Sequence, residues 1–405
     1  MPDLHIPPSA LPEQDRSLLP SDSDIEFYAK HGWYLSKKLF TDDEVDELVA
    51  ASERFYAGER DRTLPQRPPR VAYWEPAKGD VQRHNDYVHY EHDGIARLLR
   101  KPVIGAVAAA LARTTEIRVF QSTLIYKPPI AAEPTNYVPW HFDKHYWSTS
   151  SSDAMLTAFI PFHDCDEEMG TITMIDGSHR WRETGRDDTV TRHFAERDPG
   201  HLEHVLDRNA AHNNADVVKV PMIIPKGHMS FHHCRTYHGS GTNRSPRPRR
   251  AISFHLQDGA NAYRRFELST GELLEYNHDV LVRRLPDGRP DYGDPDFCPV
   301  LWRGRTTDGS GHRALEAGYV SLSLGPATPR NRPPRRAGQP GQANRRQAPA
   351  VRGAEQPARD PHVHGAPRLR RVGLHVAAEV AAAQSHLRGR AVGAVGPHRQ
   401  PPPHQ

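Results

Sequence analysis

Eight short runs of β-type sequence constrain the fold of this chain more than any other feature. Branched and aromatic residues dominate these runs, and residues typical of turns separate them. Eight antiparallel strands in two facing sheets form a jelly roll, also called a double-stranded β-helix. The sequence therefore predicts a mainly β fold of this kind, with strands at residues 117–126, 138–147, 155–163, 171–175, 217–224, 229–233, 235–239 and 251–257.

Helices are expected on the outside of this β domain. Apolar residues recur at helical spacing after acid-rich starts near residues 23 and 41, and residues 95–112 form the clearest amphipathic pattern, which predicts one continuous helix. A long charged insert, residues 181–215, separates two of the predicted strands. Inserts of this size in a compact domain are usually functional or mobile, so we expect a lid over the mouth of the barrel.

The two ends of the chain differ in composition from this domain. Residues 1–22 are rich in Pro, Ser and Asp and predict a flexible arm. Residues 325–405 contain 14 arginines and three acidic residues but no Phe, Tyr, Trp, Ile, Met, Cys or Lys. Such a tail cannot bury enough apolar surface to fold, so we expect disorder. The abrupt change raises the alternative that the tail is a translated wrong reading frame. The predicted domain spans residues 23–324.

Charge and cysteine content narrow the class of protein. The formal net charge of +3 arises from the tail, which carries +11, whereas residues 1–324 carry −8. No nucleic-acid partner is therefore expected, although a binder that uses the basic tail remains an alternative. Three scattered cysteines predict reduced thiols rather than a disulfide framework. No apolar run reaches membrane-spanning length and no signal-peptide pattern opens the chain, so we expect a cytoplasmic protein without membrane contact.

The stretch Trp140-His141-Phe142-Asp143 predicts a metal site. On a strand, His141 and Asp143 share one face because successive side chains alternate. A third ligand is available in His238, with His228, His232 and His233 as competitors nearby. Two histidines and one carboxylate form the facial triad of non-haem Fe(II) oxygenases, which leaves coordination positions open. The alternative is that this common pair is only part of an ordinary surface strand.

Arg249 follows His238 by 11 positions and predicts an anion site. A guanidinium holds a carboxylate through two parallel hydrogen bonds, so a metal ion and this arginine together imply a 2-oxoacid cosubstrate. Arg250 is the alternative clamp, because Arg249 and Arg250 point to opposite faces of a strand. Ser240 shares the inward face with His238, so its hydroxyl can reach the same carboxylate.

Four motifs in a fixed order resemble the phytanoyl-CoA dioxygenase family over residues 23–305. They are Tyr126-Lys127-Pro128-Pro129, His141 to Trp147, Asp176-Gly177-Ser178-His179, and His238-Gly239-Ser240 continuing through Asn243 and Ser245 to Arg249. The resemblance implies a jelly-roll enzyme that uses Fe(II) and the cosubstrate 2-oxoglutarate. It implies that His141, Asp143 and His238 bind the metal and that Arg249 and Ser240 bind 2-oxoglutarate. It also places Thr123 and Phe159 beside 2-oxoglutarate, with plain core packing as the alternative for both.

The implied reaction consumes O₂ and 2-oxoglutarate, releases succinate and CO₂, and hydroxylates a small molecule of secondary-metabolite or acyl type. Asp143 argues against the halogenase branch of this fold, in which a small residue replaces the carboxylate. His145, Tyr146 and Trp147 are expected to continue the ligand strand and to line the substrate mouth, with core packing as the alternative for Trp147. The rival function is a cupin-like jelly roll that binds a metal without 2-oxoglutarate turnover.

Overall fold

The computed structural model describes residues 11–68, 70–133, 136–182, 199–268, 271–305 and 316–318. The chain divides into two units, residues 1–326 and 327–405, and every described residue belongs to the first. The predicted tail, residues 1–10 of the predicted arm and residues 183–198 of the predicted lid lie outside the described residues. The rest of the arm differs from expectation: residues 13–16 form a helix, and Leu11 is buried in the core.

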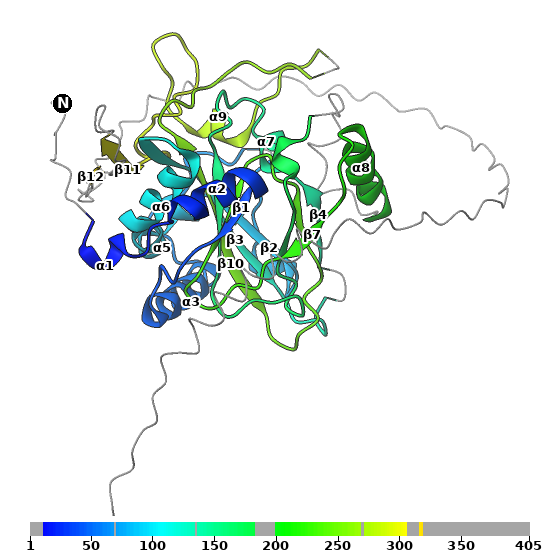
Figure 1. Ribbon diagram of the computed structural model, residues 1–405. Helices are drawn as coiled ribbons and strands as arrows, with labels where there is room; N and C mark the ends of the chain where they lie inside the picture. The colour runs from blue at the N-terminus through cyan, green and yellow to red at the C-terminus, as the bar shows by residue number, and fades with distance from the viewer. Residues whose placement is uncertain are drawn as a thin grey trace, which may run out of the picture. The chain divides into compact units, whose positions relative to one another are not determined.

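Two antiparallel sheets form the β part of the molecule (Figure 1). The larger has the order β1-β8-β5-β10-β3-β11-β12, with β2 also paired to β3, and the smaller has the order β4-β9-β6-β7. This arrangement is mainly β, as predicted. The large sheet contains β1 (Trp33–Leu35), β2 (Arg83–Asp86), β3 (Glu116–Lys127), β5 (Leu156–Pro161), β8 (Ser230–His233), β10 (Arg249–Asp258), β11 (Val300–Arg305) and β12 (Glu316–Gly318). The small sheet contains β4 (Val138–His141), β6 (Ile172–Ile175), β7 (Lys219–Pro221) and β9 (His238–Ser240).

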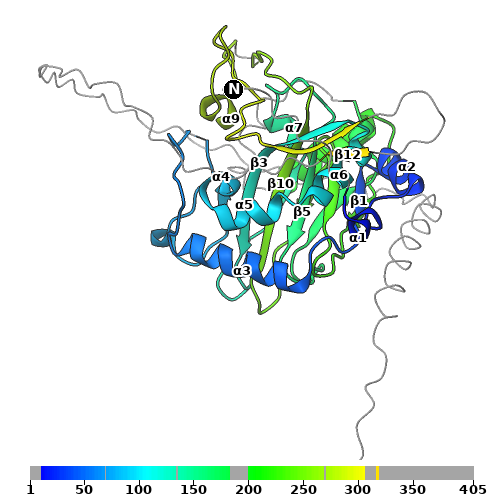
Figure 2. The ribbon, with the colours of Figure 1, turned by 90° about the vertical axis from the view of Figure 1, so that its left-hand side faces the viewer.

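Helices from residues 22 to 112 cover the outer face of the large sheet (Figure 2). Capping boxes at Ser21 and Thr41 satisfy the first free N–H groups of α2 and α3. The predicted single helix over residues 95–112 is wrong, because Pro102 lacks an N–H and starts a new helix after Lys101. The helices are α1 (Glu13–Arg16), α2 (Asp22–His31), α3 (Asp42–Tyr56), α4 (Val88–Glu91), α5 (Asp93–Leu99), α6 (Pro102–Ala112), α7 (Asp143–Tyr146), α8 (Pro199–His212) and α9 (Asn277–Leu281).

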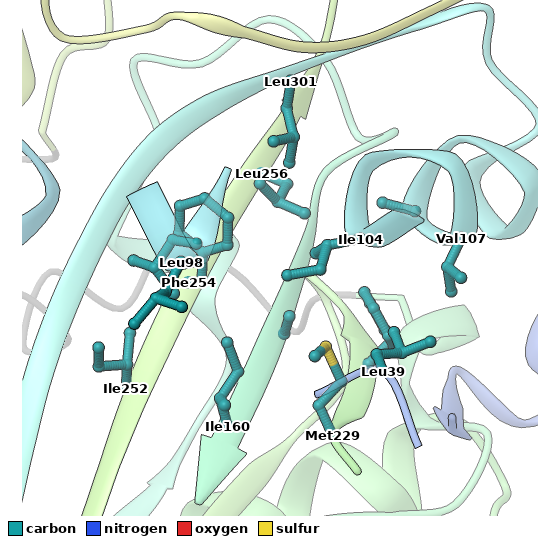
Figure 3. Close-up of a cluster of buried hydrophobic side chains, with 14 of the residues drawn as sticks. Leu39, Leu98, Ile104, Val107, Ile160, Met229, Ile252, Phe254, Leu256 and Leu301 are labelled. Carbon is teal, nitrogen blue, oxygen red and sulfur yellow. The ribbon is translucent and has the colours of Figure 1, made fainter. Parts of the chain in front are cut away.

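The main hydrophobic core lies between these helices and the large sheet (Figure 3). Ile252, Phe254 and Leu256 of β10 are buried there, in one cluster with Leu98 of α5 and Ile104 of α6. Because side chains alternate along a strand, the other face of β10 points into the jelly roll. The alternation predicted for this strand is therefore confirmed. Its inward residues are Arg249, Ala251, Ser253 and His255.

The predicted strand 138–147 is wrong in its second half. β4 ends at His141, and Asp143 begins the short helix α7. Phe142 keeps an extended backbone, with φ −130° and ψ 141°, so His141 and Asp143 still point to the same side. His145, Tyr146 and Trp147 therefore do not continue the ligand strand. Trp147 is buried in a second apolar cluster, which bears out core packing.

The described part of the predicted lid contains α8, which lies beside β4 at the small sheet (Figure 1). Trp140 of β4 donates a hydrogen bond from Nε1 to Glu203 of α8 over 2.5 Å, and Glu203 also pairs with Lys219 of β7 at 3.0 Å. These contacts attach α8 to the outer face of the small sheet. None of the helices within the described ranges combines the length and apolar character needed to cross a membrane.

Candidate metal and cosubstrate site

Three predicted metal ligands meet where β4, α7 and β9 come together. β4 pairs with β9 so that His141 lies directly opposite His238, and Asp143 follows two residues after His141. Asp143 Oδ1 is 3.9 Å from His141 Nε2 and 3.6 Å from His238 Nε2. One ligand atom from each residue lies within 4.8 Å of the others, and all three side chains are buried. The structure therefore brings together the three residues that the sequence singled out.

Backbone carbonyls fix how the two imidazoles are protonated. His141 Nδ1 lies 2.8 Å from the Pro139 carbonyl, and His238 Nδ1 lies 2.9 Å from the Thr236 carbonyl. A carbonyl only accepts hydrogen bonds, so each Nδ1 carries the proton and each Nε2 presents a lone pair. Burial lowers the pKa of both histidines, most strongly that of His238, which keeps the rings neutral.

The carboxylate of Asp143 completes a donor set that suits Fe(II). Burial by itself would raise its pKa, but nearby histidines, His238 first, hold the pKa well below its ordinary value. An ionised carboxylate and two neutral imidazoles on one side of the ion are the ligands of the facial triad. The residues present therefore fit the metal that the sequence implied.

The competing histidines take other positions. His228 contacts the Lys226 carbonyl through Nδ1, and the ring of His233 packs against His179. His232 lies closer, with Nε2 at 3.3 Å from Asp143 Oδ2 and its ring centre 4.3 Å from that of His238. It faces the oxygen of Asp143 that points away from the two ligand histidines.

Two buried cations lie together at another point of the jelly-roll interior. Arg249 of β10 pairs in register with Lys127 of β3. Arg249 donates from Nη1 to the Gly170 carbonyl at 2.6 Å, and its Nε has no hydrogen-bond partner among the described residues. Lys127 Nζ donates to Ser240 Oγ at 2.7 Å and to the Gly241 carbonyl at 2.6 Å. Within the described ranges, no carboxylate pairs with either cation.

Electrostatics mark this pair as a site for an anion. Burial lowers the pKa of Arg249 to about 10. Burial, together with the charge of Arg249, lowers the pKa of Lys127 well below its ordinary value. Burial causes the shift of Arg249, whereas burial and the charge of Arg249 together cause that of Lys127. An anion placed between the two side chains would oppose both shifts. Sequence reasoning named Lys127 only as part of a motif, because burial of a lysine cannot be read from its neighbours.

The remaining predicted residues occupy defined places. Ser240 accepts a hydrogen bond from Lys127, and Phe159 lies with its ring centre 5.4 Å from the Arg249 guanidinium carbon. Thr123 shares the inward row with Phe159 across β10, but its hydroxyl donates to Asp86 at 2.7 Å. Arg250 extends the other way and pairs with Glu53 of α3, so the alternative clamp is excluded.

Comparison with known proteins places this site in a family. Residues 28–251, more than half of the chain, match the family model described as phytanoyl-CoA dioxygenase (PhyH). The chain belongs to the phytanoyl-CoA dioxygenase family. Peroxisomal phytanoyl-CoA dioxygenase from Bos taurus is 24% identical over 296 residues, covering 70% of this chain and 81% of the relative. Ectoine dioxygenase from Bordetella bronchiseptica is 28% identical over 233 residues, covering 56% and 72%.

A solved structure supports the fold. SnoK, described as a non-haem α-ketoglutarate-dependent carbocyclase from nogalamycin biosynthesis, matches with a TM-score of 0.52 and 23% identity. The match covers 73% of this chain and 99% of SnoK, and it confirms the jelly-roll fold with flanking helices. As a member of the phytanoyl-CoA dioxygenase family, the chain is a 2-oxoglutarate-dependent, non-haem iron dioxygenase, as its motifs predicted.

Proposed function

We propose that this phytanoyl-CoA dioxygenase family member hydroxylates a small molecule of secondary-metabolite or acyl type, releasing succinate and CO₂. One observation carries the proposal: three ligand side chains and two buried cations line the same jelly-roll interior. The metal ligands would face the keto acid end of 2-oxoglutarate, and the two cations would face its distal carboxylate. The related enzymes are named for phytanoyl-CoA and for ectoine, which supports a small-molecule substrate.

His141, Asp143 and His238 would hold the iron, and Arg249 and Lys127 would hold the distal carboxylate of 2-oxoglutarate. An unpaired charge in a protein interior is costly, so two such cations side by side favour binding of an anion. A guanidinium and an ammonium together offer several donors, and Ser240 adds a hydroxyl. Gly170 supports the clamp through its carbonyl, in a backbone conformation with φ +66° that favours glycine.

Bound iron would supply the oxidising power, by coupling decarboxylation of 2-oxoglutarate to oxidation of a C–H bond with O₂. The chain's own residues position and shield the reactants. His141 and His238 direct their Nε2 lone pairs inward because their Nδ1 protons are held by carbonyls. Phe159 would pack against the carbon chain of the cosubstrate, and Thr123 would lie in the same inward row. These residues would keep water out and orient the keto acid.

The proposal is tested by adding 2-oxoglutarate to the Fe(II)-loaded protein without oxygen and recording the visible spectrum. A weak charge-transfer band is expected, and succinate should form when O₂ is admitted. Variant Asp143→Ala serves as the control, because it removes the carboxylate ligand and should abolish both signals. Iron binding without the band or without succinate would instead favour a metal-binding jelly roll that lacks turnover. Product analysis across acyl and secondary-metabolite candidates then identifies the substrate class.

A further inference from the structure

The two oxygens of the Asp143 carboxylate have different surroundings. Oδ1 faces the Nε2 atoms of His141 and His238, at 3.9 and 3.6 Å. Oδ2 accepts a hydrogen bond from the hydroxyl of Thr157 on β5 at 2.5 Å. His232 Nε2 approaches the same oxygen at 3.3 Å. One oxygen is therefore directed toward the metal position, while the other is engaged by residues of the large sheet.

A chain of hydrogen bonds continues from Thr157 into that sheet. Thr157 Oγ1 lies 2.8 Å from His255 Nδ1. The hydroxyl has a single proton, which goes to the ionised carboxylate because the carboxylate can only accept. The second contact of the hydroxyl must then be as an acceptor, so His255 Nδ1 carries a proton and donates it. The order of donation is therefore His255 to Thr157 to Asp143.

The sheet holds these residues in one row. Thr157 of β5 pairs with His255 of β10 on one side and with His232 of β8 on the other. All three side chains are buried and point inward from adjacent strands. Hydrogen bonding within a packed sheet fixes the backbone positions, so the Thr157 hydroxyl has little freedom to follow a rotating carboxylate. The row therefore forms a rigid support beneath Asp143.

From this geometry we infer that Thr157 is a positioning residue, which holds Asp143 so that it binds the metal through Oδ1 alone. The inference rests on the proposed function, because it concerns the metal ligand of the same site. A carboxylate that binds through both oxygens occupies one more coordination position. The facial triad is useful because it leaves positions open for cosubstrate and O₂. By engaging Oδ2, Thr157 keeps one of those positions available.

The test uses Thr157→Val, which removes the hydroxyl at nearly constant shape, and Thr157→Ser, which keeps it. A matched control is Thr171→Val, because the Thr171 hydroxyl is also buried and donates at 2.6 Å, but to the Met222 carbonyl. Each full-length variant is titrated with Fe(II) in the absence of oxygen, and its spectrum is recorded with 2-oxoglutarate. Melting temperatures without metal show how much of any effect is structural.

Loss of the hydroxyl should weaken Fe(II) binding about tenfold or more, the range typical for residues that orient metal ligands. The charge-transfer band should shift or weaken, because a rotated carboxylate competes with the keto acid. Thr157→Ser should restore the Fe(II) affinity and the charge-transfer band. Thr171→Val should have the same Fe(II) affinity and the same band as the unaltered protein.

The negative results separate the proposed function from the positioning role. Should the unaltered protein bind Fe(II) no better than Asp143→Ala, the proposed function itself is overturned. Should the unaltered protein bind Fe(II) normally and Thr157→Val show the same affinity and band, only the positioning role is overturned. A Thr157→Val defect that Thr157→Ser does not repair also overturns it, since the hydroxyl would then not be the cause.

Discussion

At the scale of single residues, the interior of this enzyme contains two positive charges that no carboxylate of the described residues balances. Arg249 and Lys127 are fully buried cations that bond to carbonyls and a hydroxyl. Neutral acceptors bind only some of their hydrogens, since Arg249 Nε has no partner among the described residues, and they do not balance the charge. The free protein therefore retains an electrostatic penalty, which a bound dicarboxylate would remove. In the proposed function, this penalty would favour the binding of 2-oxoglutarate at this end of the site.

The first prediction concerns Arg249→Gln. Removing one partner of a buried, hydrogen-bonded charge pair costs several kcal/mol, so the Kd for 2-oxoglutarate should rise on the order of 100-fold. Fe(II) affinity should stay unchanged, because Arg249 does not contact the ligand triad. Calorimetric titration of the metal-loaded protein with 2-oxoglutarate, and of the metal-free protein with Fe(II) under anaerobic conditions, measures the two constants. The matched control is Arg250→Gln, whose side chain points outward to Glu53; an equal loss in this variant would contradict the assigned clamp.

The second prediction follows from the lowered pKa of Lys127, which burial and the nearby Arg249 cause. Binding of the cosubstrate needs the ammonium form of Lys127. At any pH where Lys127 of the free protein has lost its proton, binding therefore takes up one proton. The Kd for 2-oxoglutarate should be constant below the free-protein pKa of Lys127 and rise above it, by up to about tenfold per pH unit.

Calorimetry of the Mn(II)-loaded protein between pH 7 and pH 9 checks this, using two buffers of different ionisation heat to count protons. Lys127→Met should bind 2-oxoglutarate more weakly at pH 7 and lose this contribution to the pH dependence. Folding of the free protein has the opposite pH dependence, because the lowered pKa belongs to its folded state. Between the lowered pKa and the ordinary value of 10.5, the unfolded chain binds more protons, so the free energy of unfolding rises with pH. An affinity for 2-oxoglutarate that strengthens with rising pH would refute this account of Lys127.

At the scale of elements, α6 packs against β11 with unusually little space. A Cβ added to Gly105 would lie 2.7 Å from Trp302 Cβ and 2.9 Å from Leu301 Cγ. Glycine in the middle of a helix is ordinarily unfavourable by about 1 kcal/mol relative to alanine. Its use here therefore reflects the close approach of the strand rather than the preference of the helix. This contact attaches the last strands of the chain to the helical layer.

The third prediction is that Gly105→Ala destabilises the protein although it improves helix propensity. The added methyl group meets the stem of Trp302 and the side chain and backbone of Leu301, so the strand must move. Overpacking of this kind costs about 1–3 kcal/mol, more than the helix gains. Urea unfolding monitored by circular dichroism should show a lower midpoint with an unchanged slope. A higher midpoint would mean that β11 yields easily and that the contact is not restrictive.

The strands and helices show which features of the fold can be predicted from sequence patterns. The two faces of β10 are correctly separated by its sequence, because the apolar residues Ile252, Phe254 and Leu256 recur at every second position. β2 cannot be predicted from its own residues, because Arg83, His84, Asn85 and Asp86 show no apolar alternation. Its formation depends on pairing with β3. The split between α5 and α6 was missed although Pro102 marks it, since the apolar pattern continues across the break.

At the scale of the whole molecule, the site was more predictable than its surroundings. The three ligands, Arg249 and Ser240 stand in short motifs with a fixed order, and the structure gathers them into one interior. Lys127 and Thr157 were assigned no role, because their importance depends on strand register across neighbours far away in sequence. Register is a property of the folded sheet, and no local pattern encodes it.

The fourth prediction concerns the second unit of the chain, residues 327–405. All residues of the proposed site lie in the first unit, so removing residues 327–405 should leave Fe(II) affinity and succinate formation within about twofold, an effect below about 0.5 kcal/mol. Melting temperature and turnover of the shortened and full-length proteins provide the comparison. The deleted segment carries a net charge of +11 and the rest of the chain −8, so any affinity for nucleic acid should disappear with the segment. Loss of turnover would show that these residues support the dioxygenase.

The pairing of β4 with β9 has a consequence for biosynthesis. His141 and His238 are 97 positions apart in the chain, yet they face each other across one strand pair. During translation the first two ligands emerge long before the third, and no complete chelating set exists until β4 and β9 have paired. Iron capture thus reports on the formation of this strand pair, and a nascent or truncated chain that ends before β9 should not retain the ion.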